Sequence, residues 1–582
     1  MLSCKGLTVR VGNSSAPILN NAEIDFEAGV MNAVIGPSGC GKTTLVKAML
    51  KILPAEGESF FCGERIRESE DIVGKVGFAP QFTCVHPMLT VREAVESALE
   101  ISVSDSAERA RRLENILKII GLEEHAGKFV SSLSGGQLRR IGLGVELACD
   151  PPVMCCDEVT SGLDPLSENS ILDMMQKLCR ERGKTFVCII HNLAKLDYFK
   201  RITVVHCAEI VFQGSLDELK AYFEIDSALS LYDVLNSKDV SQWRQKWSER
   251  RAEIAARRAD ESERRGVEAS GGSAGVSGAG GGVEGGEFCE GGGSARRPSA
   301  VSQLLTLLRR RYKLFFRDTT YLFLTLAISF GFPLVVVIFA LGGLPQIETL
   351  ALDRNLGALE ELRENLRLQI EAANTATIVT GLILFQAVLL GLMGANNSAR
   401  EIASERSLYE KERLLGLRPS AYALSKIIYT LSLALFQGVW MCVFVKYICK
   451  FPGDAFTQSA QMVMVCASMT AICLAFSANF SSPEKSNLVS IYLVGFQLPL
   501  SGVVLALPEA LKWVCRPFIG TYWGWAGYLT SMKDSPIYDA YVQTSSAWET
   551  LPSPALSFAV MSLQCAAALA FVFWGCCVKK WS

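Results

Sequence analysis

Nine residues, GPSGCGKTT from Gly36 to Thr44, follow the β-rich run MNAVI and lead into the helix-like run TLVKAML. They fit the pattern G-x-x-x-x-G-K-[ST], whose glycines let backbone N–H groups curl around phosphate at the N-terminus of a helix. In this pattern Lys42 brings a positive charge to the β and γ oxygens of a nucleotide, and the Thr43 hydroxyl ligates Mg²⁺. An unrelated Gly-rich turn is the alternative, and the strand-to-helix context argues against it. The pattern predicts an α/β fold with a nucleotide site.

A second motif, VMCCDE from Val153 to Glu158, is an apolar run that ends in two carboxylates. Beside a bound nucleotide, Asp157 is expected to hold Mg²⁺, generally through water, and Glu158 to polarise the attacking water as general base. A buried strand that ends in an acidic pair is common, so this motif does not decide the matter alone. Its position downstream of the Gly-rich loop favours the nucleotide interpretation.

The length and composition of the chain predict one soluble and one membrane domain. Its 582 residues are too many for one core, because single cores stop growing near roughly 250 to 300 residues. The first half reads as soluble α/β protein, whereas the second contains several apolar runs near the ~20 residues that span a bilayer. The net charge of -2 gives no reason to expect nucleic acid. The cysteines of the soluble half indicate a reduced, cytosolic domain rather than a disulfide scaffold.

The expected boundaries are an ATP-binding domain at 1–240, a linker at 241–300 and a transmembrane domain at 301–582. From Leu2 to about Phe223, β-rich and helix-like runs alternate, the rhythm of a parallel sheet with crossover helices. The linker begins with the charged run QWRQKWSERRAEIAARRADESERR, which is expected to form a solvated helix. It continues as a Gly/Ser-rich tract, which is expected to be a flexible tether.

The membrane domain is expected to contain six helices. It opens with SQLLTLLRRRYKLFFRD, whose apolar residues at helical spacing beside a basic face suit a helix in the headgroup plane. An even number of spans returns the chain to its starting side. The expected spans are approximately 320–343, 375–394, 422–446, 457–478, 487–508 and 555–578.

Basic residues cluster before the first span, between the second and third, and after the last, so both termini are expected to be cytoplasmic. The clusters are Arg309, Arg310, Arg311 and Lys313; Arg400, Arg406, Lys411, Arg413 and Arg418; Lys579 and Lys580. Lys446 and Lys450 then fall outside, a mild violation. Of two long outer loops, 345–373 is expected to hold a short helix. The loop near 509–553 is expected to place its aromatic residues at the membrane interface, and part of it to re-enter the membrane. These are Trp513, Tyr522, Trp523, Trp525 and Tyr528.

Between the Gly-rich loop and the acidic run lies SSLSGGQLRR, in which Leu133 to Gln137 read LSGGQ. This is the signature of ABC ATPases, and the segment resembles it without a mismatch. The resemblance extends to Gln81 in FAPQ, which is similar to the Q-loop, to Ser161–Asp164 in SGLD, similar to the D-loop, and to His191, similar to the switch histidine. Taken singly, Gln81 can be any loop amide and His191 a satisfied edge histidine. Six motifs in family order argue against those alternatives.

The resemblance implies that two chains build each ATP site. In this family the signature of one ATPase completes the site on the other's phosphate loop, so a dimer with a second copy or a paralogous half-transporter is expected, held together by ATP. The Ser134 hydroxyl and the amides of Gly135 and Gly136 would face the γ-phosphate. The implied cofactors are ATP and Mg²⁺. The implied catalytic residues are Glu158, His191 and Gln81; the metal ligands are Thr43, Gln81 and Asp157; the nucleotide-binding residues are Gly36, Pro37, Ser38, Gly39, Cys40, Gly41, Lys42, Thr43, Thr44, Ser134, Gly135, Gly136, Gln137 and Asp164.

The domain order, ATPase first, resembles the G subfamily of ABC half-transporters, the white and sterol or drug exporter type. HPMLTVREAV, after Gln81, is very similar to that subfamily, and so is REIASERSLYEKERLLGLRPSAYALSKI, between the second and third spans. In the subfamily the latter contains the coupling helix, which touches the ATPase and passes its closure into the membrane. The alternative is a charged loop that only orients the chain.

Three departures indicate a divergent member. The adenine-stacking aromatic residue expected around Arg10 to Asn13 is absent from the sequence. Gln137 and Val159 stand where the subfamily generally has Glu and Pro.

The leading hypothesis is an exporter or floppase for lipophilic or amphipathic small molecules or lipids in a plasma or inner membrane, since the spans hold few charges. By resemblance, Phe385, Gln386, Phe496, Gln497 and Pro499 are candidates for its cavity, with helix packing as the alternative. A competing hypothesis is a regulatory ATPase that moves no substrate and acts mechanically on a membrane partner. The six spans argue against a third class, soluble P-loop or DNA-repair ATPases.

Overall fold

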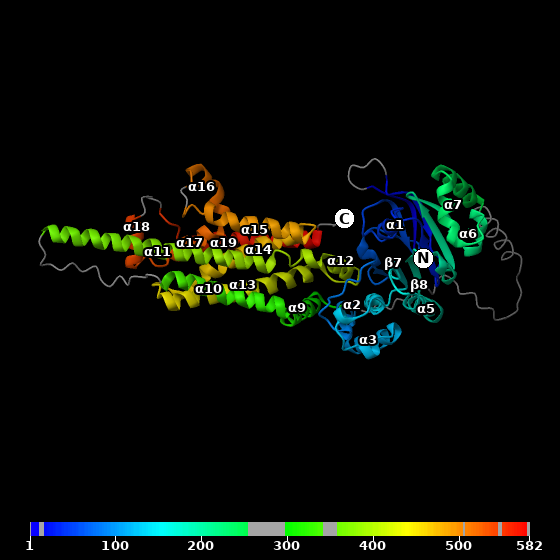
Figure 1. The fold of residues 1–582 in the computed structure, drawn as a ribbon, viewed down its shortest axis with the longest axis horizontal. Helices are drawn as coiled ribbons and strands as arrows, with labels where there is room; N and C mark the ends of the chain where they lie inside the picture. The colour runs from blue at the N-terminus through cyan, green and yellow to red at the C-terminus, as the bar shows by residue number, and fades with distance from the viewer. Residues whose placement is uncertain are drawn as a thin grey trace, which may run out of the picture. The chain divides into compact units, whose positions relative to one another are not determined.

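The computed structural model describes residues 2–10, 17–253, 297–341, 358–504, 507–544 and 550–578, which form two compact units (Figure 1). The first unit contains Met1–Ser299 and Leu408–Leu417, and the second contains Ala300–Ser407 and Arg418–Trp581. The Gly/Ser-rich tether, the expected adenine-stacking positions 11–13, and Lys579 and Lys580 lie outside the described residues.

A six-stranded sheet forms the centre of the first unit, in the order β10-β9-β3-β8-β7-β6. All neighbouring strands are parallel except β9 and β10, which are antiparallel. Every residue of β3, β6, β7 and β8 is buried, as expected for a sheet covered on both faces. The predicted parallel sheet is confirmed. The strands are β3 Met31–Ile35, β6 Val76–Ala79, β7 Val153–Asp157, β8 Thr185–Ile189, β9 Arg201–His206 and β10 Glu209–Gly214.

A second, four-stranded antiparallel sheet, which the sequence analysis did not anticipate, has the order β2-β1-β4-β5. Its strands are β1 Leu2–Val9, β2 Leu19–Asp25, β4 Glu56–Phe61 and β5 Glu64–Ile66. Helices lie between these strands along the chain and, for the last two, after β10. They are α1 Lys42–Met49, α2 Val91–Ser102, α3 Ser106–Ile120, α4 Gly135–Glu146, α5 Pro165–Arg182, α6 Leu216–Phe223 and α7 Leu231–Ser237.

The helix that follows α7 is packed onto the first unit, so the expectation of a solvated helix from residue 241 is wrong for its described part, residues 240–253. Trp243 and Trp247 are 1% and 7% exposed. Because these residues are four apart, they share one helix face. The ring of Trp243 lies 5.0 Å from that of Phe223, and the ring of Trp247 lies 5.8 Å from that of Phe212. The expected domain boundary at 240 therefore falls inside a packed segment.

Five described helical segments of the second unit are long and apolar enough to cross a membrane. They correspond to the expected spans one to four and six. The expected fifth span is α15, Pro483–Leu500, which is not among them, and its first turn carries Glu484 and Lys485. The five are Thr319–Ala340, Ala373–Leu414, Pro419–Cys449, Ala455–Asn479 and Pro554–Cys577.

The second of these segments begins as part of a long helix, α11, Ala358–Ser398, which has 41 residues. At 1.5 Å per residue it is about 60 Å long, roughly twice the hydrocarbon thickness of a bilayer. The short outer helix expected within 345–373 is therefore not a separate element, because its described part is continuous with the second span.

Helix α14, Ala455–Asn479, packs against α11, α13 (Pro419–Cys449), α17 (Gly520–Thr530) and α19 (Pro554–Phe573). Small residues allow the close approach, as is common between membrane helices. A Cβ on Gly394 of α11 would lie 2.7 Å from the Cys466 carbonyl oxygen, and one on Gly438 of α13 would lie 2.7 Å from Val463 Cα. The remaining helices of the unit are α9 Ala300–Arg317, α10 Thr319–Leu341, α16 Glu509–Cys515 and α18 Pro536–Thr544.

The aromatic-rich loop near 509–553 divides into buried and exposed aromatic residues. Tyr522, Trp525 and Tyr528 on α17 are buried, and the Trp525 Nε1–H donates to the Thr380 carbonyl at 3.2 Å. Trp513 on α16 is 84% exposed. The expectation of an interfacial position is therefore wrong for the three buried rings, which pack inside the helix bundle.

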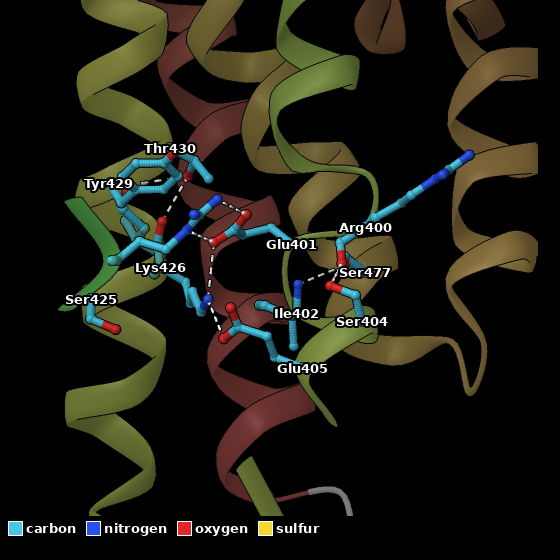
Figure 2. A network of polar contacts seen from close by, with 12 residues as sticks. Arg400, Glu401, Ile402, Ser404, Glu405, Ser425, Lys426, Tyr429, Thr430 and Ser477 are labelled. Atoms are coloured by element: carbon cyan, nitrogen blue, oxygen red, sulfur yellow. Dashed lines mark hydrogen bonds and ion pairs between the residues drawn. The ribbon is translucent and has the colours of Figure 1, made fainter. Parts of the chain in front are cut away.

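A cluster of four charges joins three segments of the second unit (Figure 2). Arg311 of α9 donates to both carboxylate oxygens of Glu401, at 2.6 and 2.7 Å. The Lys426 ammonium of α13 lies 2.9 Å from Glu401 and 2.6 Å from Glu405. Glu401 and Lys426 are 7% and 5% exposed at their side chains. We call Arg311, Glu401, Glu405 and Lys426 the charge cluster.

The backbone beside the charge cluster is held by a hydroxyl from α14. Ser477 Oγ accepts hydrogen bonds from the N–H groups of Ile402 and Ala403, both at 3.0 Å (Figure 2). Arg406 donates to the carbonyls of Ala478 and Phe480, at 3.0 and 2.5 Å. The turn after α11 is therefore fixed to the end of α14 by both its backbone and a side chain.

Candidate functional site

The Gly-rich loop connects β3 to α1, as its sequence predicts. Two of its glycines are required by close contacts in left-handed backbone conformations. A Cβ on Gly36, whose φ is 152°, would lie 2.0 Å from the Val205 carbonyl oxygen. A Cβ on Gly41, whose φ is 100°, would lie 2.7 Å from the Ile18 carbonyl oxygen. Any larger residue at these positions would displace the loop from the start of α1.

Two of the three side chains expected to hold Mg²⁺ are adjacent, whereas the third, Gln81, contacts Glu158. Thr43 Oγ1 donates to Asp157 Oδ1 at 2.9 Å, joining the start of α1 to the end of β7. Burial raises the pKa of the Asp157 carboxyl above its usual range, and the Thr43 hydroxyl acts in the opposite direction. A hydroxyl and a carboxylate are the oxygen ligands that Mg²⁺ takes beside nucleotide phosphates, so these residues fit the ion. Nearby, the Lys42 ammonium donates to the carbonyls of Gly36 and Pro37 at 2.9 and 2.8 Å.

Three expected catalytic side chains meet at the carboxyl ends of the parallel strands. Glu158 follows β7, His191 follows β8 and Gln81 follows β6. His191 Nε2 lies 2.5 Å from Glu158 Oε1, and Gln81 Nε2 donates to Glu158 Oε2 at 2.8 Å. Glu158 also has a φ of 52°, in the left-handed region that non-glycine residues rarely adopt. This conformation is typical of residues held at functional sites.

Glu158 and His191, but not Gln81 or Asp157, line a cavity of about 360 Å³, a volume typical of small-molecule sites. Of the expected site residues, the cavity brings together the phosphate loop, the start of α1, Glu158 and His191. It is lined by Ile18, Ser38, Gly39, Gly41, Lys42, Thr43, Thr44, Glu158 and His191.

Among the described residues that line this cavity, none belongs to the signature. Ser134 is the N-cap of α4, where its hydroxyl accepts from the Gln137 N–H at 3.4 Å and the Gln137 side chain accepts from the Ser134 N–H at 3.1 Å. This reciprocal arrangement is a capping box, which Gln satisfies as well as Glu. Gly135 and Gly136 form the first turn of α4. The structure therefore separates the signature from its own chain's phosphate loop.

Asp164 caps α5, and its carboxylate accepts from the Ser167 N–H at 3.0 Å. Hydrogen bonds from Ser167 lower the pKa of the Asp164 carboxyl. Pro165 stands at the first helical position, which suits its missing N–H. Asp164 does not line the described cavity, so no contact within one chain places it at the nucleotide, as its expected binding role would require.

Two family models match separate parts of the chain. One described as ABC transporter matches residues 19–161, and one described as ABC-2 type transporter matches residues 302–524. The methionine import ATP-binding protein MetN of Caulobacter vibrioides is 30% identical over 236 residues, which cover 39% of this chain and 71% of that protein. The chain belongs to the ABC transporter family. It contains an ABC-type ATP-binding domain, followed by an ABC-2 membrane domain.

Other relatives overlap with this ABC transporter over its ATPase domain. An ABC transporter ATP-binding protein/permease of Saccharomyces cerevisiae is 33% identical over 225 residues, 35% of this chain and 17% of that protein. The chain spans 54% of the glycine betaine/carnitine/choline transport ATP-binding protein OpuCA of Bacillus subtilis, so it covers about half or less of these two relatives. A solved dimeric ATP-binding cassette bound to ADP and Pi has 28% identity, a TM-score of 0.35, and coverage of 37% of this chain and 99% of that chain.

Two residues at the ATPase site of this ABC transporter escaped the sequence analysis. Ile18, immediately before β2, lines the cavity. Arg139, in the second turn of α4, donates to the Gln81 carbonyl and so links the signature helix to the Q-loop. The only signal for Arg139 was its place two residues after Gln137, in LSGGQLRR.

The stretch that resembles the coupling helix contributes Leu408–Leu417 to the first unit. Within that unit, the Lys411 ammonium lies 3.0 Å from Glu146 Oε1, and the two side chains are 3% and 0% exposed. Burial raises the pKa of the Glu146 carboxyl, and Lys411 acts against that rise. Cys149 Sγ also donates to the Leu415 carbonyl at 3.3 Å. Because Glu146 ends α4, the stretch packs at the end of the signature helix.

The candidate cavity residues of the membrane domain divide into two groups. Gln386 and Gln497 are 0% and 1% exposed, and Gln497 Oε1 accepts from the Thr521 hydroxyl at 3.2 Å. Gln497 therefore has a partner inside the helix bundle, which fits helix packing, whereas the buried amide of Gln386 has no hydrogen-bond partner among the described residues. Phe496 is 56% exposed and Phe385 is partly buried, with its ring 5.8 Å from that of Phe339. Phe496 is the most exposed of these four residues, and the fifth candidate, Pro499, is partly buried.

Proposed function

We propose that two copies of this chain, or the chain and a paralogue, clasp ATP and Mg²⁺ between their ATPase domains and use hydrolysis to move an amphipathic molecule across a membrane. One observation supports the dimer above all. The nucleotide cavity is lined by the phosphate loop, Glu158 and His191, but by none of the described signature residues from Ser134 to Gln137. A signature placed away from its own site can serve the site of a second chain.

The contacts support a role for each residue of the site. Lys42 holds the β- and γ-phosphates, and Thr43 with Asp157 holds Mg²⁺. Glu158 accepts the proton of the attacking water, while Gln81 and His191 fix its two carboxylate oxygens, at 2.8 and 2.5 Å. On closure, Ser134 and the amides at the start of α4 complete the site from the partner. ATP binding thereby favours the closed dimer, and hydrolysis releases it.

Coupling runs through the stretch that includes Leu408–Leu417. The buried ion pair between Lys411 of this stretch and Glu146 supports this role. Glu146 is the last residue of α4, and the first turn of the same helix carries the signature. A movement of α4 on closure would therefore act on Lys411. The alternative role, orientation of the chain by positive charge, does not explain why Lys411 is buried against a carboxylate.

The proposed substrate class rests on the chemistry of the spans. Helices α10, α14 and α19 contain no Asp, Glu, Lys or Arg, which argues against an ion or proton path. Helix α15 presents an apolar stripe at helical spacing, with Leu488, Ile491, Tyr492 and Phe496 all more than half exposed. Such a surface fits a lipid or a lipophilic small molecule. We place both termini in the cytoplasm and the spans in a plasma or inner membrane.

Reconstitution into vesicles tests this function. Purified chain should move a fluorescent short-chain phospholipid or a lipophilic dye in the presence of Mg-ATP, and Glu158→Gln should stop the movement. Normal ATP turnover without any flux, across a panel of lipids and dyes, would favour a regulatory ATPase that acts on a membrane partner. Full turnover by a strictly monomeric chain would overturn the proposed dimer.

A further inference from the structure

A second cavity of the first unit, with a volume of about 450 Å³, shares no lining residue with the nucleotide cavity. It lies between α3, the residues that follow α4 and the end of α5, and its volume is typical of small-molecule sites. None of its lining residues belongs to a motif of the ATPase site, so nucleotide binding does not explain it. We call it the arginine cavity. Its charged lining residues are Glu108, Arg111, Arg112, Asp150 and Arg182.

Four aliphatic side chains form the apolar part of the lining. Ile116, Leu147 and Leu178 are buried, and Ile119 is partly buried. Because Ile116 and Ile119 are three residues apart on α3, they share one face of that helix. The arginine cavity therefore offers an apolar surface beside its charged groups. This combination suits a ligand that has both a polar head and an apolar body.

The three guanidinium groups of the arginine cavity are held by hydrogen bonds. Glu108 accepts from Arg111 Nε and Nη2, both at 2.8 Å, and from Arg112 Nε at 2.7 Å. Arg112 Nη1 also donates to a main-chain carbonyl after α4 at 3.3 Å, and Arg182 Nη2 donates to Asn115 Oδ1 at 3.0 Å. Within the described residues, Nη1 of Arg111, Nη2 of Arg112 and Nη1 of Arg182 have no hydrogen-bond partner. Positioned N–H groups thus remain for an anion.

The charges at the arginine cavity do not balance. Asp150 is paired with Lys184 at 2.7 Å, and Glu108 offsets only one of the three guanidinium groups. Hydrogen bonds from Arg111 and Arg112 lower the pKa of Glu108 to about 2, so this carboxylate is charged at neutral pH. Two positive charges therefore have no counter-charge among the described lining residues. A phosphate monoester, whose charge is about -2 at neutral pH, matches this excess, and its oxygens suit the planar fork of a guanidinium.

We infer that the arginine cavity binds an organic phosphate monoester. Arg111, Arg112 and Arg182 hold the phosphate, and the aliphatic part of the lining, which includes Ile119, holds the apolar group of the ligand. The cavity is a second ligand site of the first unit and goes beyond the proposed function, because none of its residues binds or hydrolyses ATP there.

Equilibrium dialysis of the full chain in phosphatidylcholine vesicles, with empty vesicles as the background, tests this inference. The probe is 1-naphthyl phosphate, which joins one phosphate to an apolar ring system, and saturating Mg-ADP occupies the nucleotide cavity throughout. The probe should bind saturably, with about one molecule per chain. Inorganic phosphate, which lacks the apolar group, and 1-naphthol, which lacks the phosphate, should each bind about tenfold more weakly or worse.

Three variants assign the binding to the arginine cavity. Arg182→Gln should weaken the binding of 1-naphthyl phosphate by about tenfold or more, because it removes a charge-assisted hydrogen bond. Ile119→Ala should weaken it by about threefold but leave the affinity for inorganic phosphate within about twofold. Arg180→Gln, at an exposed arginine of the same helix as Arg182, is the matched control and should leave both affinities unchanged, since it does not line the cavity. ATP turnover by each variant checks that the chain is folded.

Vesicles that contain phosphatidic acid distinguish two sources of the same chemistry. Displacement of the probe by this lipid would assign the ligand to a lipid headgroup, and undiminished binding would assign it to a soluble phosphate monoester.

Three outcomes would overturn the inference. One is the absence of saturable binding to the unaltered chain. Another is an unchanged affinity in Arg182→Gln, because the guanidinium would then not hold the phosphate. The third is binding of 1-naphthol as tight as that of the probe, which would reduce the cavity to an apolar surface. Failure of the proposed function is distinct, since it is measured by flux and ATP turnover and not by binding of the probe.

Discussion

His191 Nε2 lies 2.5 Å from Glu158 Oε1 at the carboxyl ends of two neighbouring strands. The contact orients a carboxylate whose backbone is itself held in the left-handed region. A general base must be fixed within hydrogen-bond reach of the water that it activates. The histidine and Gln81 together leave Glu158 little rotational freedom, which is the arrangement expected of a positioned base.

Glu158→Gln should lower ATP turnover by about 100-fold or more, because the amide cannot accept the proton of the attacking water. ATP should still bind, so this variant should accumulate dimers locked by ATP. Lys42→Ala should lose turnover by losing the nucleotide itself. Size-exclusion chromatography with ATP and a nucleotide-binding assay separate the two variants. Equal loss of binding in both would contradict the assigned roles.

Thr43→Val should raise the Mg²⁺ concentration needed for half-maximal ATPase activity by about tenfold or more, since it removes one of the two oxygens 2.9 Å apart. Thr43→Ser keeps the hydroxyl and should behave like the original chain. A Mg²⁺ titration of ATPase activity at saturating ATP checks both variants. If Thr43→Val and Thr43→Ser require the same Mg²⁺ concentration, Thr43 is not a metal ligand.

Much of the ATPase site could be predicted because its motifs are local and its strands are parallel. The phosphate loop, Glu158 and His191 each stand directly after a buried run, and the ends of parallel strands meet at one edge of the sheet. Motifs that are far apart in the sequence thus become neighbours in space. The same reasoning could not predict Ile18, because this residue lies beside the antiparallel strands β1 and β2 of the second sheet.

Contacts between distant segments could not be predicted. No motif singles out Glu146, and Lys411 was counted only among the basic residues that orient the chain, so nothing in the sequence paired them. Trp243 and Trp247 were read as solvated because charged residues surround them, although their four-residue spacing marks a buried face. The aromatic residues of α17 were assigned to the membrane interface by composition, which cannot distinguish a lipid contact from packing inside a bundle.

Lys411→Met should destabilise the chain by about 3 kcal/mol at neutral pH, because it leaves the Glu146 carboxylate buried without its cation. The loss should grow as pH rises. Burial already raises the pKa of Glu146, so the folded state binds its proton more tightly than the unfolded state, whose pKa is about 4.3. Unfolding free energy therefore falls as pH increases from there towards the raised pKa. Thermal unfolding at several pH values measures the effect.

The double variant Glu146→Gln/Lys411→Met is the matched control for that prediction. It has no titrating group at this position, so its stability should not share the extra decline with pH. It should also recover part of the stability lost in Lys411→Met. An identical pH dependence in the single and double variants would show that the pair is hydrated in solution.

Glu401→Gln should destabilise the membrane domain by about 3 kcal/mol, because Glu401 contacts both cations of the charge cluster. Arg311→Lys should also be destabilising, since an ammonium cannot donate to both carboxylate oxygens as the guanidinium does. Thermal unfolding in detergent measures both variants. Glu484→Gln, at an exposed glutamate of α15, is the control and should change stability by less than about 1 kcal/mol.

Cys40 should be a poor target for thiol reagents even though it lies in the phosphate loop. Its side chain is 6% exposed, and burial raises the pKa of the thiol, with the nearby Lys42 ammonium acting against that rise. The thiolate, which is the reactive form, is therefore scarce at neutral pH. The side chain instead fills space beneath Gly36, where a Cβ would lie 2.8 Å from Cys40 Sγ.

N-ethylmaleimide should first label the exposed Cys207, and this labelling should leave ATPase activity intact. A slower inactivation should follow, and its rate should increase as pH rises. Cys40→Ala should retain ATPase activity and abolish that slow inactivation. If ATPase inactivation is instead as fast as Cys207 labelling and disappears in Cys40→Ala, then Cys40 is a reactive thiol of the site.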